Sequence, residues 1–196
     1  MIQGIDVSEN QGHLPMSFWQ EAVDKGVQFA YIRCSYGRTG VDEEFAHNVE
    51  CAHAVGLMVG AYHYSYALNV EQALQEAEHC RDVIEDSGVF LELPVFYDME
   101  DADHYKARNG FAFDAAEITE MCRVFGENLL LNWGVYASLS WLEKYIDWKA
   151  LGCPVWNAEW GKVDDIQGYV WQDSGDDSNF TIAGKVIDHD WMYLEV

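Results

Sequence analysis

Two carboxylates stand two residues apart at the end of an apolar, strand-like run near the middle of the chain. The apolar residues 95–97 lead directly into Asp98, Met99 and Glu100. Residues two apart in an extended chain point the same way, so Asp98 and Glu100 are predicted to share a face, with backbones roughly 6–7 Å apart. Two acids held that close at a buried strand end repel each other, and one tends to stay protonated near neutral pH. A protonated acid beside an ionised one is suited to cleaving a glycosidic bond.

The rest of the chain supplies a regular framework for this pair. Apolar, strand-prone runs occur at residues 3–8, 27–34, 57–66, 94–97, 133–137, 154–158, 169–172 and 182–188. Amphipathic helix patterns follow each of the first five runs, whereas the later connections are rich in Gly and Asp and show no convincing helix. This order predicts an α/β fold, an irregular TIM-like (β/α)5(β)3 barrel that has lost its last three helices. We expect residues 1–196 to form a single domain.

Acids stand at the ends of the first, fourth and last predicted strands, at Asp6, Asp98 and Asp188. Chemistry in such barrels sits at the carboxyl ends of the strands, and the first strand pairs with the eighth when the barrel closes. The other polar or aromatic side chains predicted at this rim are Arg33, Ser35, Tyr62, Tyr64, Tyr136, Trp156 and Gln172. Aromatic rings stack on sugar faces and acids hold hydroxyl groups, so the rim predicts a carbohydrate-binding groove. The structural alternatives are turn residues for the acids, an internal ion pair for Arg33 and core packing for the rings.

Composition limits the possible partners. The net charge is −23, from 11 basic and 34 acidic side chains, which argues against nucleic acid because phosphate binding needs a basic surface. No apolar run approaches the roughly 20 residues of a membrane helix, and the N-terminus lacks the basic and apolar regions of a signal peptide. We therefore expect neither a nucleic-acid partner nor a membrane partner, and we expect a monomer.

The cysteines and histidines do not predict a metal centre or a cofactor. The five cysteines are widely spread and include no Cys-x-x-Cys pair, which is typical of buried free thiols in a reducing compartment. His47 and Cys51 lie one helical turn apart, but two ligands do not make a zinc site.

Several segments resemble glycoside hydrolase family 25, the lysozyme-like muramidases of bacteria, phages and some fungi. The matching segments are residues 4–8 (Gly-Ile-Asp-Val-Ser), 60–64 (Gly-Ala-Tyr-His-Tyr), 97–100 (Tyr-Asp-Met-Glu), 134–136 (Gly-Val-Tyr), 171–172 (Trp-Gln) and 187–188 (Ile-Asp). They follow the family's order and spacing over nearly the whole chain. The resemblance implies a flattened (β/α)5(β)3 barrel that hydrolyses the β-1,4 bond between N-acetylmuramic acid and N-acetylglucosamine in peptidoglycan.

The resemblance also implies roles for the acids. Glu100 would be the proton donor, Asp98 would assist on the opposite side of the sugar, and Asp6 and Asp188 would complete the acidic floor. Where the family often has Asp-x-Asn, this chain has Asp at 188 and at 190, so either could be the functional acid. The position of Asp188 directly after two apolar residues favours it.

Three further alternatives follow from the same residues. We expect the substrate's acetamido group to assist the reaction, with Asp98 stabilising the cationic ring and with net retention, and the first alternative is direct inversion with a water between the acids. The barrel could bind sugar without catalysis, or could be a metal-dependent hydrolase that uses the four acids as oxygen ligands.

The absence of a leader and the odd number of cysteines fit a phage endolysin, cytoplasmic until it is released to the cell wall at lysis. A secreted enzyme with its leader removed is the alternative.

Overall fold

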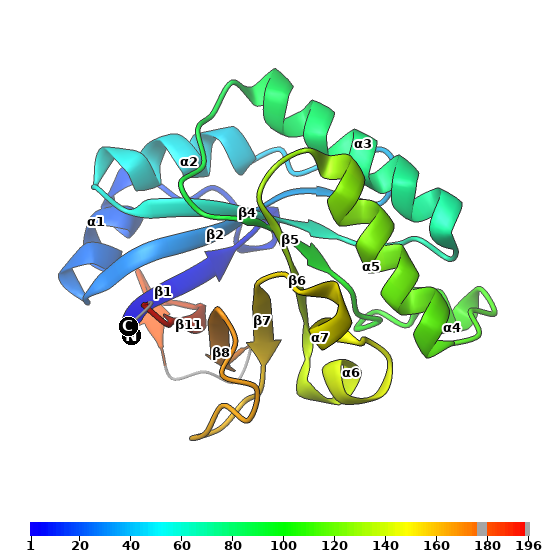
Figure 1. Cartoon of the computed structure of the whole chain (residues 1–196). Coiled ribbons are helices and arrows are strands. Elements are labelled where there is room, and N and C mark those ends of the chain that lie inside the picture. The colour runs from blue at the N-terminus through cyan, green and yellow to red at the C-terminus, as the bar shows by residue number, and fades with distance from the viewer. Residues whose placement is uncertain (176–179, 195–196) are drawn as a thin grey trace.

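Eight strands close into a barrel in this computed structural model, which describes residues 1–175 and 180–194 (Figure 1). The barrel strands are β1 (Ile2–Val7), β2 (Val27–Tyr36), β4 (Met58–Tyr64), β5 (Val95–Asp98), β6 (Trp133–Ser138), β7 (Val155–Ala158), β8 (Val170–Ser174) and β11 (Asp188–Met192). They pair in this order, and β11 closes the ring by pairing with β1. The short strand β3 (Gly40–Val41) extends the sheet beside β2, and β9 (Thr181–Ile182) pairs with β10 (Lys185–Val186) as a separate hairpin.

Helices follow each of the first five barrel strands. They are the 3-10 turn η1 (Glu9–Gln11) and the helices α1 (Met16–Asp24), α2 (Phe45–Ala54), α3 (Val70–Ser87), α4 (Tyr105–Arg108), α5 (Ala115–Leu129), α6 (Leu139–Lys144) and α7 (Trp148–Leu151). The described residues after β7 and β8 contain no helix, so one side of the barrel is bare (Figure 1). The predicted single-domain (β/α)5(β)3 barrel is confirmed. The one predicted helix after the fifth strand is divided into α6 and α7.

The long helices begin and end where their end residues predict. The Asn69 side chain accepts a hydrogen bond from the Gln72 amide at 3.0 Å and caps α3, while Gly88 ends that helix in the left-handed conformation. Asp114 caps α5 in the same way, through the Glu117 amide at 2.9 Å.

The interior of the barrel is filled by aromatic rings. Tyr31, Phe96 and Trp156 are fully buried there, and the Tyr31 ring lies 4.7 Å from that of Trp156 and 5.1 Å from that of Phe96, between centroids. Glycines on neighbouring strands make room for these rings: a Cβ at Gly60 would lie 2.2 Å from Tyr31, and one at Gly134 would lie 2.5 Å from Phe96. The barrel is therefore closed from below by a packed floor.

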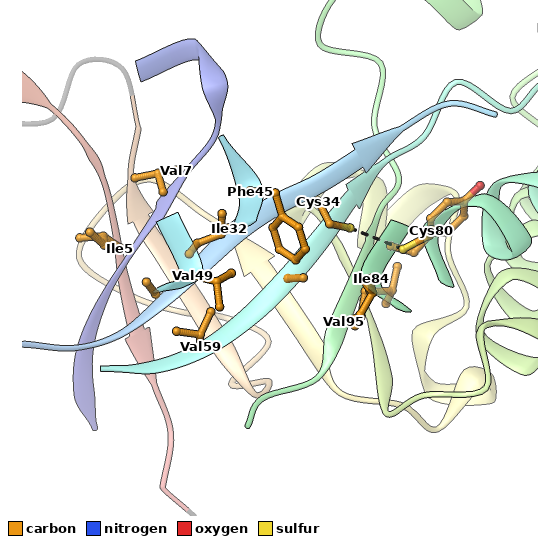
Figure 2. Packing of buried hydrophobic residues seen from close by; sticks show 14 of the residues in the cluster. Ile5, Val7, Ile32, Cys34, Phe45, Val49, Val59, Cys80, Ile84 and Val95 are labelled. Atoms are coloured by element: carbon orange, nitrogen blue, oxygen red, sulfur yellow. Dashed lines mark hydrogen bonds between the residues drawn. The ribbon is translucent and has the colours of Figure 1, made fainter. Parts of the chain in front are cut away.

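The outward faces of the strands form a second core against the helices. Ile32, Val59 and Val95 pack there with Phe45 and Val49 of α2 (Figure 2). The five cysteines are all free thiols, as predicted, and Cys34 and Cys80 lie within hydrogen-bonding distance, 3.6 Å between sulfurs. Among the described residues, no helix combines the length and the apolarity that crossing a bilayer requires.

The last strand differs from the prediction. Residues 181–186 form the β9–β10 hairpin rather than the start of a barrel strand, and Ala183 and Gly184 at its turn both have positive φ, 50° and 77°. Strand β11 begins at Asp188 and runs antiparallel to β1 and β8, with Asp188 opposite Asp6. Asp188 thus opens its strand instead of ending it, yet still lies at the rim where β1 ends.

Candidate active site

A pocket of about 450 Å³ opens at the end of the barrel where β1 to β8 finish and β11 starts. Its walls are formed by the acids Asp6, Asp98, Glu100, Asp103 and Asp188, the aromatic residues Tyr62, Tyr64, Tyr66, Tyr136 and Trp156, and by Asn10, Arg33, Ala102 and Gln172. Acids surrounded by aromatic rings match the requirements of a sugar: hydrogen-bond acceptors for hydroxyl groups and flat surfaces for the ring faces.

The end of β5 places its two acids as the alternation predicts. Asp98 and Glu100 both line the pocket, while Met99 between them is fully buried in the core under the helices. Asp98 pairs in register with Tyr64 of β4 and with Tyr136 of β6. Neighbouring strands therefore flank the Asp98 carboxylate with a tyrosine on each side.

Asp6 lies at the bottom of the pocket and is held by a glutamine. The Gln172 side-chain amide donates to Asp6 Oδ2 at 2.8 Å. The Gln172 carbonyl oxygen in turn accepts from the Tyr136 hydroxyl at 3.1 Å and from the Trp160 indole at 3.3 Å. This chain of hydrogen bonds crosses from β1 through β8 to β6 and fixes the orientation of the Asp6 carboxylate.

The two aspartates of β11 lie at different depths. Asp188 lines the pocket, whereas Asp190, two residues further along the same face, is fully buried behind it. The Trp156 indole donates to Asp190 Oδ1 at 2.9 Å. Asp188 is thus the member of the pair that a substrate can touch, and Asp190 supports Trp156 from below.

Arg33 is both a wall residue of the pocket and a member of an internal ion pair. It lines the pocket, and its guanidinium also donates to Asp42 Oδ2 at 2.9 Å and to Glu9 Oε1 at 3.1 Å. Two carboxylates outside the pocket thus neutralise the one arginine among the acids on its wall, and they fix its direction.

The electrostatics of the pocket favour a protonated Glu100. Burial, the largest cause, and the negative charges of Asp103, Asp101 and Asp188 together raise the pKa of Glu100 to about 7, against the opposing effect of the Lys106 ammonium. The sequence predicts this protonation from repulsion by Asp98, whereas the largest cause in the structure is burial. At neutral pH a substantial fraction of Glu100 carries a proton that it can donate.

The other buried acids shift in the same direction. Burial raises the pKa of Asp98 well above its usual range, with Glu100 as the largest charge contribution and Lys106 opposing it. Burial likewise raises the pKa of Asp6, with the charge of Asp188 next in size. The pocket therefore holds fewer negative charges at neutral pH than its number of carboxyl groups.

Lys106 carries a buried ammonium that no pattern in the sequence predicts. Only 1% of the residue is exposed. Its Nζ donates to the backbone carbonyl of Glu100 at 3.0 Å and to that of Ser65. Burial lowers its pKa, and the buried carboxylate of Glu76 on α3 acts in the opposite direction. Lys106 thus joins the segments that follow β4 and β5 and holds the backbone of Glu100 in place.

Comparison with known proteins identifies the family of this chain. The family model for glycosyl hydrolases family 25 matches residues 5–176. The chain belongs to this family. The autolytic lysozyme of Clostridium acetobutylicum is 28% identical over 182 residues, which is 89% of this chain and 51% of that protein. The chain thus spans about half the length of this relative.

Solved structures of family 25 and related enzymes share the fold. The family 25 glycosyl hydrolase of Bacillus anthracis superposes with a TM-score of 0.74 at 22% identity, covering all of this chain and 90% of that one. The modular autolysin LytC of Streptococcus pneumoniae, solved with a synthetic peptidoglycan ligand, gives a TM-score of 0.84 at 21% identity, over 98% of this chain and 46% of that one. The barrel described above is therefore a family 25 barrel.

Ser35 is the one predicted site residue of this family 25 chain that does not reach the pocket. Its hydroxyl is fully buried and hydrogen-bonds His63 Nδ1 at 2.8 Å, on the side of the sheet that faces the helices. The reason is a bulge in β2: Arg33 pairs with Tyr62, but Ser35 pairs with His63, which leaves Cys34 as an extra residue. The prediction of Ser35 at the pocket rim assumed unbroken alternation, and the bulge instead turns its side chain toward the helices.

The remaining ten predicted residues line the pocket, together with four that were not predicted. Tyr66 follows Tyr64 by two residues, so an extension of the β4 alternation beyond the strand end would have found it. Asn10 lies in the turn η1, while Ala102 and Asp103 lie in the loop after β5. No periodic pattern marks loop residues of this kind.

Proposed function

We propose that this chain is a lysozyme-type peptidoglycan hydrolase that cleaves the β-1,4 bond between N-acetylmuramic acid and N-acetylglucosamine. Membership of family 25 supports hydrolysis of a glycosidic bond. The observation that carries the proposal is the pairing of Asp98 with Glu100 on one pocket wall, with the pKa of Glu100 raised to about 7. An acid with that pKa is poised to donate a proton near neutral pH.

In the proposed mechanism the substrate supplies its own nucleophile. Glu100 donates its proton to the leaving glycosidic oxygen while the substrate's acetamido oxygen attacks the anomeric carbon, which breaks the glycosidic bond and forms a cyclic oxazolinium ion. Asp98 lies beside that cation, and the positive charge favours its ionised form in spite of its burial. Water then attacks the anomeric carbon and gives a proton back to Glu100. The bond between the acetamido oxygen and the anomeric carbon breaks, and the product keeps the original anomeric configuration.

The alternative is direct displacement by a water activated at a carboxylate, which inverts the anomeric centre. NMR of the freshly released reducing end separates the two mechanisms. A β-anomer supports the substrate-assisted route, and an α-anomer contradicts it.

The central test is the variant Glu100→Gln, which keeps the shape of the side chain and removes its proton. We expect the hydrolysis of purified cell walls to fall by about 10²–10⁴-fold, the usual contribution of a general acid. The control is Glu85→Gln, at an exposed position near the end of α3. Mass spectrometry of the released muropeptides identifies the bond that is cut. Near-normal turnover of Glu100→Gln would remove Glu100 from the role, and reducing ends on N-acetylglucosamine would contradict the proposed bond.

The same assays distinguish the two alternatives from the sequence. A non-catalytic sugar-binding barrel would bind walls without lowering their turbidity. A metal-dependent hydrolase would lose activity in the presence of a chelator. Among the described residues, only one group of three side chains places its potential ligand atoms within 4.8 Å of one another, and that group lies outside the pocket.

We propose further that the protein acts as a monomer on bacterial cell-wall peptidoglycan and is cytoplasmic until it is released to the wall at lysis. The five free thiols, four of them buried, are consistent with folding in a reducing compartment. Light scattering tests the monomer. Fractionation of producing cells before and after lysis tests the location, and a secreted enzyme would appear in the medium of intact cells.

A further inference from the structure

A cluster of two histidines and a glutamate lies on the outside of the barrel, away from the pocket walls. His13 comes from the loop between η1 and α1, Glu44 from the residue before α2, and His47 from the first turn of α2. The potential ligand atoms of these three side chains all lie within 4.8 Å of one another. His47 was paired in the sequence with Cys51 alone; the fold adds two ligands from elsewhere in the chain.

The three side chains of the cluster are in direct contact with one another. His13 Nδ1 lies 3.0 Å from Glu44 Oε2. The rings of His13 and His47 stack with centroids 4.3 Å apart and an angle of 26° between planes. Ligands of zinc at about 2.0–2.2 Å in a tetrahedron are separated by roughly 3.3–3.6 Å. Because stacked rings direct their in-plane lone pairs nearly parallel, the exposed His13 ring has to turn out of the stack for the three atoms to meet on one ion.

His47 is already oriented as a ligand would be. Its Nε2 lies 3.0 Å from the backbone carbonyl oxygen of Leu14, a fully buried residue. That hydrogen bond requires the proton on Nε2 and leaves the lone pair on Nδ1. A ligating histidine typically donates its second ring N–H to a carbonyl in this way, which fixes both its tautomer and its ring direction.

The charge around the cluster favours a cation. Glu43 and Glu44 precede α2, and the chain as a whole carries a net charge of −23. A field of this sign raises the local concentration of divalent cations. Two imidazoles and one carboxylate form a donor set that suits zinc, with one position left for water.

We propose that His13, Glu44 and His47 form a binding site for a divalent transition metal, and we expect Zn²⁺ to be the preferred ion. The ion would join the loop after β1 to the start of α2. That loop also carries Asn10, which lines the pocket, and Glu9, whose carboxylate holds Arg33 at 3.1 Å and accepts from the Glu43 amide at 3.1 Å. The site therefore stabilises one wall of the pocket from outside without touching the substrate.

The test uses the whole chain, freed of metal and titrated with Zn²⁺ or Co²⁺ by calorimetry. We expect one ion to bind per chain, and affinity to fall at least tenfold in His13→Ala. His13 is exposed, with 64% of its side chain accessible, so this variant should fold normally. The matched control is His53→Ala: His53 and Glu92 form a surface pair at the same 3.0 Å, but do not belong to a group of three ligands.

Two further readouts keep the result unambiguous. The absorption spectrum with Co²⁺ should lack thiolate charge-transfer bands, because none of the five cysteines belongs to the proposed donor set. Zn²⁺ should slow hydrogen exchange of the backbone amides of residues 12–14 in the native chain and in His53→Ala, but not in His13→Ala. The proposal is overturned by an absence of saturable binding, by equal affinity in His13→Ala, or by thiolate bands.

Discussion

Replacing Glu100 by glutamine should stabilise the fold at alkaline pH although it removes the proposed acid. The carboxyl has a pKa of about 7 in the folded chain, compared with 4.5 for an ordinary glutamate. Between these two values the folded protein keeps a proton that the unfolded chain has lost. Unfolding therefore releases a proton, and stability falls as the pH rises.

The size of the effect follows from the two pKa values. At 1.36 kcal/mol per pH unit, the difference between 4.5 and about 7 corresponds to about 3 kcal/mol. This destabilisation is absent below the lower pKa, grows between the two, and is complete above the upper one. Glutamine cannot ionise, so the variant should match the natural chain near pH 4 and exceed its stability by about 3 kcal/mol near pH 8.

Urea denaturation followed by tryptophan fluorescence measures the difference at both pH values, and the eight tryptophans give a strong signal. Lys106 contacts the backbone carbonyl of Glu100, so the substitution leaves that hydrogen bond in place. Glu85→Gln, at an exposed position, is the control substitution measured at the same two pH values. Equal effects of Glu100→Gln at both pH values, or a loss of stability at alkaline pH, would refute the assignment of a partly buried, proton-binding carboxyl.

Two other substitutions test the surroundings of the site. Lys106→Met removes the ammonium that lowers the pKa of Glu100, so the alkaline limb of the pH profile of kcat/KM should move to higher pH; an unchanged limb would show that the two groups do not interact. Ser35→Ala removes a hydrogen bond to a buried imidazole and should cost about 1 kcal/mol in urea denaturation, with wall hydrolysis within about twofold of normal. A tenfold loss of turnover at equal stability would return Ser35 to the substrate site.

The order of strands and helices could be predicted because each element carries a local signal. Alternation placed Asp98 and Glu100 on one side of the sheet and Met99 on the other, and the structure has this arrangement. Closure of a parallel barrel then brings distant strand ends to one rim, which is why ten of the predicted residues meet in one pocket.

The errors arose where pairing between strands overrides the local pattern. The bulge at Cys34 in β2 turns Ser35 to the helix side, and no residue type there announces it. The direction of β11 depends on its pairing with β1 and β8, and residues 181–186 form their own hairpin first. Lys106 escaped notice because a lysine in a polar loop is normally exposed; only the folded chain shows that its ammonium is buried.

The aromatic floor of the barrel links packing to the chemistry of the acids. Gly60 and Gly134 leave space for Tyr31 and Phe96, and these rings pack with Trp156 beneath the pocket. Because these buried rings fill the barrel below the acids, water reaches the carboxyl groups from the open side alone. That burial is the largest cause of the raised pKa values of Asp6, Asp98 and Glu100. A barrel with a looser floor would hydrate the same acids, return their pKa values toward normal, and lose the proton that Glu100 has to donate.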